Sequence, residues 1–517
     1  MELIKKNIHM EHCQNLASMQ ISLEEDQNIS DQKPDAFRVV CKKADVKIGE
    51  TKVQDDSVWV RGALAYQVLY LTDETERQLC NMEGEIPFEE RIYTNQTCMN
   101  DEVRIVAHAD DMMIRLINSR KMNVRCVVAV SVMCDTLYDE EVVVDVEHPT
   151  ACEILKKPLD ITSIVRDTRD IYRIKEEFPV PDGYPNIYSL LWKNVRIDGL
   201  TFTPMEGCIG IRGEWNAFCM YEGEEDEAEP RCFEVSRPFD GVVEVSECRD
   251  DMVLSVDWEP EQAQIEVRTD YDGEERLVGL DMELKLFIKL YRNEELTVVA
   301  DAYGLQERLE PIMKESTYRY MIKKESGKIK TSDTWENREN PERAMQILHA
   351  NGYIVDEKNV IGENDIVLAG VVHVEVLCKT ENESEPYRCV ALDLPYMHNI
   401  AVLQLPKDSP YYVKVCIEQL HAAVQGNKLD VSAVLCYHLN VYRKVAEPML
   451  TGMEKTMENG QEKTLPVMSV YYARENESLW DIGKKYRVSL NSIKETNQIN
   501  TDVLSGGEKI LIAKETL

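Results

Sequence analysis

Few residues in this chain have the type and spacing that catalysis or metal binding requires. The phosphate-binding pattern G-x-x-x-x-G-K-[ST], the zinc-protease pattern H-E-x-x-H and the nucleophile pattern G-x-S-x-G are all absent. His9, His12 and Cys13 are spaced like metal ligands, but no fourth ligand follows them. The sequence therefore predicts no catalytic, cofactor-binding or metal-binding residue, no cofactor, and a protein that is not an enzyme.

The charge of the chain restricts its partners. Its 517 residues carry a formal net charge of −35, and the sequence pI is about 4.7. An acidic surface of this size is repelled by phosphate backbones and by anionic lipid headgroups. We therefore expect no nucleic-acid partner.

The cysteines and the apolar runs indicate the compartment. The 15 cysteines are an odd number without C-x-x-C pairs, and five lie inside apolar strands, namely Cys126, Cys219, Cys378, Cys416 and Cys436. There they are typical of small hydrophobic residues in a reducing environment. No secretory signal and no run of about 18 apolar residues is visible. The expectation is a cytosolic protein without a membrane span.

One stretch occurs three times and organises the chain. It reads VWVRGALAYQVLY at 58–70, IGIRGEWNAFCMY at 209–221 and IVLAGVVHVEVLC at 366–378, with Gly62, Gly213 and Gly370 in register. Apolar residues alternate with more polar ones, which predicts a long strand with one buried face. A glycine in mid-strand is costly and usually marks a bulge or a close backbone approach. Three copies of a costly feature predict three copies of one domain.

The sequence around each copy predicts the same order of elements. A charged strand comes first, and then a proline with apolar residues at helical spacing, which predicts a short helix after Pro34, Pro185 and Pro341. Further strands follow the glycine strand, separated by turn residues. We therefore expect a mainly β protein with three tandem antiparallel β-rich domains, at 1–150, 160–305 and 312–447, each with one short helix. A sandwich or a folded-over sheet would suit strands of this length.

These repeats resemble the SPOCS domain of spore-coat proteins. Copy one carries the pattern best, in the glycine strand and in Glu85-Ile86-Pro87-Phe88. Copies two and three match the strand, but 236–239 (SRPF) and 392–395 (LDLP) stand in place of E-I-P-F. The resemblance spans residues 15 to 447.

A different module ends the chain. Residues 448–469 are polar and aperiodic, which predicts a linker. Between 470 and 513, six basic and six acidic residues balance, so the negative charge lies elsewhere. Ser478 and Ser489 are predicted N-caps of two helices between two strands, and Asn497 suits a left-handed exit from the second helix. We expect a small βααβ domain at 470–517.

This module resembles a LysM domain, whose usual form contains G-D-S-L-W-x-I-A-x-K-Y and L-x-P-G-x-x-L-x-I-P. The chain keeps Ser478-Leu479-Trp480, Ile482 and Lys485-Tyr486. It departs in the two loops that flank the glycan groove of the family, where it has Asn476-Glu477, Gly506 and Ala513. Because asparagine tolerates positive φ, the fold is expected to survive.

SPOCS repeats followed by one LysM domain resemble the layout of SipL-like spore-coat morphogenetic proteins. The resemblance implies an adaptor in the mother-cell cytoplasm, at the forespore surface. It also implies a SpoIVA-like coat-assembly ATPase as the partner of the LysM domain, and contact with other coat proteins. The alternative is a cell-wall protein that binds peptidoglycan through LysM, with hydrolase activity hidden in the repeats.

Five residues of the LysM-like module form the predicted partner-binding site. Positions 480, 484 and 487 follow i, i+4 and i+7 spacing and lie on one helical face. Leu479 and Ile482 already face inward, which leaves Trp480 on an exposed edge as an aromatic anchor. The predicted site consists of Asn476, Ser478, Trp480, Lys484 and Arg487.

Overall fold

The computed structural model describes residues 3–74, 77–94, 102–147, 152–224, 229–305, 308–336, 345–403, 405–455 and 468–513. Most of the described chain is strand, and the two helices of the described part both lie near the C-terminus. The predicted fold class, mainly antiparallel β with a small βααβ module, is confirmed.

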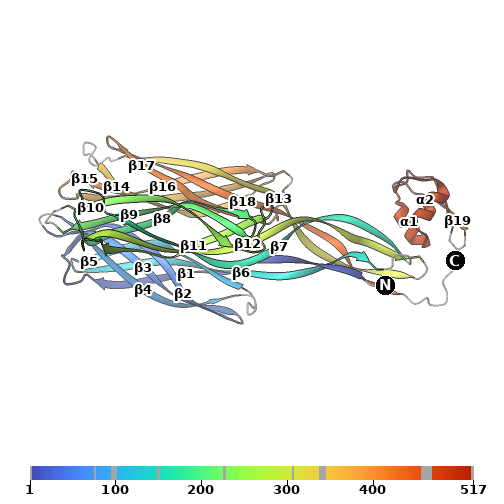
Figure 1. Ribbon diagram of the computed structural model, residues 1–517, viewed down its shortest axis with the longest axis horizontal. Coiled ribbons are helices and arrows are strands. Elements are labelled where there is room, and N and C mark those ends of the chain that lie inside the picture. The colour runs from blue at the N-terminus through green and yellow to red at the C-terminus, as the bar shows by residue number, and fades with distance from the viewer. Residues whose placement is uncertain are drawn as a thin grey trace.

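Six consecutive strands form each of three repeats, which we call repeats one, two and three (Figure 1). Repeat one contains β1 (Leu3–Asn28), β2 (Ala36–Gln54), β3 (Ser57–Thr72), β4 (Leu79–Tyr93), β5 (Glu102–Asn118) and β6 (Lys121–Val146). Repeat two contains β7 (Cys152–Pro179), β8 (Ile187–Met205), β9 (Cys208–Gly223), β10 (Arg231–Glu244), β11 (Val253–Thr269) and β12 (Glu275–Gly304). Repeat three contains β13 (Leu309–Glu336), β14 (Met345–Ile361), β15 (Asp365–Thr380), β16 (Tyr387–Ala401), β17 (Tyr411–Gln425) and β18 (Lys428–Lys455).

Each repeat is a sandwich of two antiparallel three-stranded sheets. In repeat one the sheets have the orders β2-β3-β4 and β1-β6-β5, and repeats two and three have the equivalent orders. Alternate residues of both sheets face one another, such as Val60 and Leu64 of β3 with Val124 and Val128 of β6. Because the side-chain period of a strand is two, this alternation buries one face of each sheet.

The glycine strands β3, β9 and β15 are the central strands of equivalent sheets, as the triplication predicts. Gly62, Gly213 and Gly370 are paired with Phe88, Phe239 and Tyr396, respectively. In each case the neighbouring strand on the other side has a register shift opposite the glycine. The glycines therefore leave room for an aromatic ring beside an irregular strand.

This pairing corrects the motif comparison. The proline and aromatic residue of E-I-P-F are present in all three repeats, as Pro87-Phe88, Pro238-Phe239 and Pro395-Tyr396. In copy three the equivalent residues begin one position later than the sequence suggested. All three repeats therefore have an aromatic ring that covers the glycine.

The predicted short helices after the three prolines are wrong. The apolar residues of each predicted helix lie at the start of strands β2, β8 and β14 instead, and Pro341 lies outside the described residues. Register shifts occur there, between Val39 and Cys41, between Leu190 and Trp192, and between Ile347 and His349. A bulge adds a residue and reverses the alternation of faces, so apolar residues recur at odd spacings that imitate a helix.

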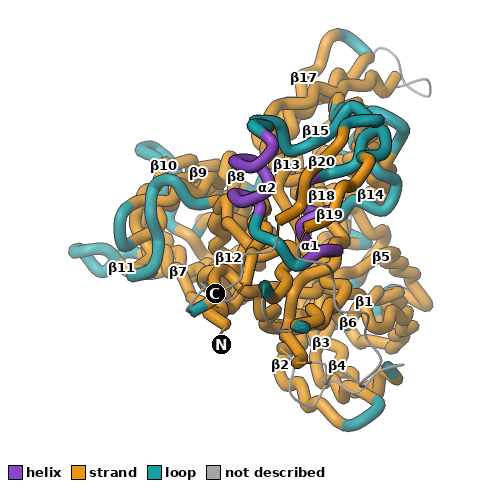
Figure 2. Tube along the Cα trace, turned by 90° about the vertical axis from the view of Figure 1, so that its right-hand side faces the viewer, coloured by secondary structure: helices purple, strands orange, loops and turns teal. Residues whose placement is uncertain are grey.

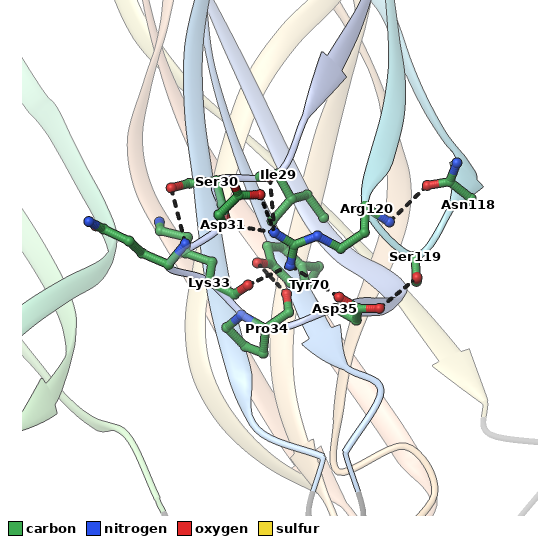
Figure 3. A network of polar contacts seen from close by, with 11 residues as sticks. Ile29, Ser30, Asp31, Lys33, Pro34, Asp35, Tyr70, Asn118, Ser119 and Arg120 are labelled. Carbon is green, nitrogen blue, oxygen red and sulfur yellow. Dashed lines mark hydrogen bonds and ion pairs between the residues drawn. The ribbon is translucent and has the colours of Figure 1, made fainter.

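Pro34 and Pro185 lie in the connections that enter these strands. In repeat one, Arg120 holds the connection by donating to the carbonyl oxygens of Ile29, Ser30 and Lys33 (Figure 3). The Tyr70 hydroxyl donates to the Pro34 carbonyl at 3.3 Å. Repeat two uses Arg276 and Tyr221 in the same way. These carbonyl groups accept hydrogen bonds from side chains, so no helix is needed to satisfy them.

The three repeats pack around a common axis, and Figure 2 shows them as three lobes. One set of contacts joins the outer faces of β3, β9 and β15 through Leu69, Phe218, Leu377 and their neighbours. This explains a difference from the predicted strand with one buried face: near its end each glycine strand has consecutive buried residues, at 68–72, 215–221 and 376–378.

The long strands β1, β6, β7, β12, β13 and β18 extend beyond the sandwiches as a stalk (Figure 1). A separate apolar cluster with residues from all three repeats fills it, including Ile8, Ile161 and Met449. β18 runs on to Lys455 and pairs with β13, so residues 448–455 are strand and not linker as predicted. Residues 456–467 lie outside the described part.

The C-terminal module contains β19 (Met468–Tyr472), α1 (Leu479–Tyr486), α2 (Leu490–Asn497) and β20 (Lys509–Ala513). Its own core includes Leu479, Ile482, Ile493 and Ile510. The predicted cap residues Ser478 and Ser489 both accept a backbone N–H of their helix. The left-handed residue that ends α2 is Gln498, and Asn497 instead binds both backbone groups of Leu511 in β20.

Candidate functional site

Trp480 lies in the first turn of α1 but does not belong to the core of its own module. Its ring packs on Tyr303 of β12, with a centroid distance of 4.9 Å and an interplanar angle of 65°. Its indole Nε1–H donates to Asp301 Oδ2 at 2.8 Å. The prediction of an exposed Trp480 is therefore wrong, because the end of repeat two covers the ring and leaves it only 8% exposed.

Lys484 follows Trp480 by one helical turn and binds the same carboxylate. Its ammonium donates to Asp301 Oδ1 at 2.7 Å and to Oδ2 at 2.6 Å. Asp301 Oδ1 also accepts the N–H of Ala302 at 2.9 Å. One carboxylate thus receives an indole N–H, an ammonium and a backbone N–H, and hydrogen bonds that involve a charged group are the stronger kind.

Tyr303 makes the second part of this contact. Its hydroxyl donates to the carbonyl of Val488, just after α1, at 2.8 Å, and its side chain is buried. Burial raises the pKa of Tyr303, and the nearby Glu153 and Asp301 raise it further, so the hydroxyl keeps its proton as a donor. Glu153 of β7 accepts the N–H of Leu490 at 3.2 Å.

The other three predicted site residues have local roles. Asn476 adopts a positive φ of 61° in the first loop, as the sequence suggested, and its N–H donates to Leu504. The Ser478 hydroxyl caps α1 by accepting from Asp481 N at 3.1 Å. Arg487 ends α1 in a left-handed conformation. The structure therefore brings Trp480 and Lys484 together at Asp301, and it shows a capping role for Ser478.

Sequence reasoning missed Asp301, Tyr303 and Glu153. They lie in strands whose charged, alternating pattern looks like that of every other stalk strand. The one available signal was a comparison between repeats: Tyr303 stands where repeats one and three carry Glu147 and Glu454, two residues beyond equivalent bulge positions.

The loops that differ from the usual LysM form contact each other. Gly506 has a φ of +95°, and a Cβ built there would lie 2.9 Å from the backbone of Glu475. Proline, which the usual form carries at this position, is restricted to a φ near −65°. The second loop therefore has a shape that the usual LysM sequence does not permit.

Two buried polar centres join the repeats away from the module. Glu11 of β1 accepts from Arg319 at 2.7 Å and from Tyr291 at 2.6 Å, and it pairs with Lys289 at 3.0 Å, so it links all three repeats. Burial raises its pKa, but Arg319 and Lys289 outweigh this effect and leave the pKa lowered. A network in which each buried charge is paired favours the ionised form.

The second centre is His349 of β14, where the three glycine-strand sheets meet. It stacks on Phe218 at 4.1 Å, and Asn194 Nδ2 lies 3.1 Å from its Nε2. Burial lowers the pKa of His349 to about 3. It borders a cavity of about 20 Å³, together with Cys41 and Glu375, which is space for one water molecule.

Within the described part of the chain, no group of three or more His, Cys, Asp or Glu side chains is arranged to hold a metal ion. The side chains of His12 and Cys13 lie outside the described residues. In the same part of the chain, no helix has the length and apolar character needed to cross a membrane.

Comparisons with known families agree with the repeats and with the module. The model of the SipL SPOCS domain matches residues 35–117 and 186–268, which are β2–β5 and β8–β11. The LysM domain model matches residues 471–513. No curated protein and no solved structure matches the chain significantly. The chain therefore has a SipL-like architecture, in which two matches to the SPOCS domain precede a match to the LysM domain.

Proposed function

We propose that this protein is a non-enzymatic adaptor of the spore envelope that acts in the mother-cell cytoplasm at the forespore surface. Its LysM domain binds a coat-assembly protein, a SpoIVA-like ATPase, and the three repeats form the scaffold that carries other coat proteins. The third repeat serves as a further SPOCS domain, since it has the strand order of the first two.

The observation that carries this proposal is the chemistry of the face made by Trp480 and Lys484. The indole of Trp480 and the ammonium of Lys484 lie one helical turn apart and both bind the Asp301 carboxylate, and the indole also packs edge-on against the Tyr303 ring. Tryptophan is enriched among residues that dominate protein–protein binding energy. A neutral module beside an acidic scaffold also approaches an acidic partner that the scaffold would repel.

The two loops of the LysM module that contain Asn476 and Gly506 also support a protein partner over a glycan. Gly506, at a position that flanks the glycan groove of the family, has a positive φ that the proline of the usual form cannot adopt, and the second loop touches the backbone of the first at Glu475. A groove with altered rims loses the shape on which sugar recognition depends.

The second candidate is a cell-wall protein that binds peptidoglycan through its LysM domain, since the family match itself points to a glycan ligand. In this case hydrolase activity would reside in the repeats. Release of reducing sugars from muramyl polymer by the purified chain would support it. We expect none, because both matched domain types are non-catalytic.

Calorimetry of the full chain against the coat ATPase and against chitin oligomers distinguishes the two candidates. We expect binding to the ATPase, loss of that binding in a chain ended after Lys455, and no binding to chitin. Trp480→Glu should weaken ATPase binding by at least about 2 kcal/mol, the range of a dominant contact residue. Micromolar chitin binding without ATPase binding would reverse the assignment.

A further inference from the structure

The face that the proposed function assigns to a partner is occupied by the chain itself. Trp480 and Lys484 bind Asp301, and Tyr303 reaches Val488 behind α1. Glu153 adds a hydrogen bond from the N-terminus of α2. In Figure 2 the two helices lie in front of the long strands of the stalk.

Among the described residues at the three stalk ends, those of repeat two alone offer this combination of groups. Register shifts place Asp145 of repeat one, Asp301 of repeat two and Gly452 of repeat three at equivalent positions near the end of the stalk. Asp145 instead pairs with Lys156 at 3.0 Å, and repeat three has no side chain there. Two residues further along, repeat two has Tyr303 and the others have Glu147 and Glu454. A carboxylate beside an aromatic ring thus exists at one of three otherwise similar places.

The module in turn has a residue that permits the contact. Gly483 lies inside α1, where glycine costs about 1 kcal/mol relative to alanine. A Cβ at this position would clash with the Tyr303 hydroxyl, whereas the nearest atom of its own module, the Val488 carbonyl oxygen, is 3.1 Å away. The usual LysM form carries alanine here. The glycine makes the helix intrinsically less stable and lets Tyr303 reach the Val488 carbonyl.

We propose that the LysM module is docked on repeat two in the free protein, and that this contact closes the partner-binding face. The inference rests on the proposed function for the identity of the partner, but not for the docking itself. A partner that binds this face displaces Asp301 and Tyr303 and must supply equivalent groups. These are a carboxylate for Trp480 and Lys484, and an aromatic ring for Trp480. The fitting partner is therefore an acidic protein surface with an aromatic residue beside a carboxylate.

Docking is tested on the full chain with two variants, one in the LysM module and one in repeat two. Gly483→Ala obstructs Tyr303 while favouring the helix, and Asp301→Ala removes the shared carboxylate. Asp145→Ala, at the equivalent bulge of repeat one, is the matched control. Fluorine NMR of 5-fluorotryptophan-labelled protein reports on Trp480, whose signal is assigned with Trp480→Phe. Small-angle scattering reports on the shape.

We expect the Trp480 resonance to move in both variants and not in the control, and the radius of gyration to increase. Circular dichroism should stay unchanged, because neither variant removes a residue of the module's core. If the resonance and the scattering of both variants equal those of the wild type, the docking is overturned.

Whether docking closes the partner-binding face is tested by the affinity of the same three variants for the coat ATPase. Protein whose LysM module is docked cannot bind the ATPase, so a docked fraction lowers the apparent affinity. Gly483→Ala and Asp301→Ala should therefore bind the ATPase at least about tenfold more tightly than the wild type. Asp145→Ala should bind it with unchanged affinity. If the variants bind the ATPase with the affinity of the wild type although the Trp480 resonance has moved, docking does not close the partner-binding face. Absence of ATPase binding by every form would overturn the proposed partner instead, and the fluorine signal would still decide the docking.

Discussion

Gly62 of β3 lies directly opposite Phe88 of β4, and the Phe88 ring occupies the space that a side chain at position 62 would need. A Cβ built on Gly62 would lie 2.6 Å from Phe88 Cζ and 2.5 Å from the Lys47 carbonyl oxygen. The same relationship recurs at Gly213 with Phe239 and at Gly370 with Tyr396. The repeated glycine is thus a packing requirement of the sandwich.

Gly62→Ala should destabilise repeat one by about 1–3 kcal/mol, because the added Cβ meets a backbone oxygen that cannot move away. Gly213→Ala should cost less, since its nearest neighbours are side-chain atoms of Phe239 and Leu200 at 3.0 and 3.1 Å. Hydrogen exchange of β3 and β9 measures each effect locally. Gly49→Ala, where the nearest atom is 3.7 Å away, is the control and should leave exchange unchanged.

Glu11→Gln should destabilise the junction of the three repeats by about 3–5 kcal/mol, because it leaves Arg319 buried without its counter-charge, whereas Lys289 keeps its ion pair with Asp135. Urea unfolding of the full chain measures this loss. Glu141→Gln breaks an exposed pair with Lys5 and should cost less than about 1 kcal/mol. Equal effects of the two substitutions would contradict a junction stabilised by Glu11.

The stability of the chain should fall as the pH drops below 6.5, in part through His349. Its pKa is lowered to about 3 in the folded protein, so the unfolded chain binds a proton that the folded chain does not. From a normal value of 6.5, this contribution amounts to a loss of about 2 kcal/mol at pH 5.

His349→Gln should therefore unfold with a weaker pH dependence than the wild type between pH 7.5 and 5, whatever its absolute stability. The exposed His108→Gln serves as the control for the histidine-to-glutamine change itself. Urea midpoints at four or five pH values measure both. An unchanged slope in His349→Gln would show that the imidazole takes up its proton in the folded protein over the same pH range as in the unfolded chain.

Ser478→Ala should destabilise the LysM module by about 1 kcal/mol, because the hydroxyl caps α1. Ser489→Ala, which removes the cap of α2, should have a similar effect. Thermal melting of the module within the full chain, followed by hydrogen exchange of α1 and α2, measures both. If Ser478→Ala weakens ATPase binding without any change in exchange, Ser478 is a contact residue as first predicted.

Much of the fold follows from local pattern. Alternation along 58–70 and its two copies was sufficient to predict long antiparallel strands and three equivalent units, because burial of one sheet face imposes a period of two. The same rule failed where strands bulge. At Val39–Cys41 and Leu190–Trp192 the extra residue shifts the phase, and the resulting spacing resembled a helix.

The candidate site was likewise predictable only in part from the sequence. The i, i+4 spacing within α1 was enough to place Trp480 and Lys484 on one face, since helix geometry depends on neighbouring residues alone. What lies against that face was decided by the tertiary structure. Asp301 is 179 residues before Trp480, and only the packing of three stalk ribbons brings its carboxylate to the end of the molecule that the LysM module reaches.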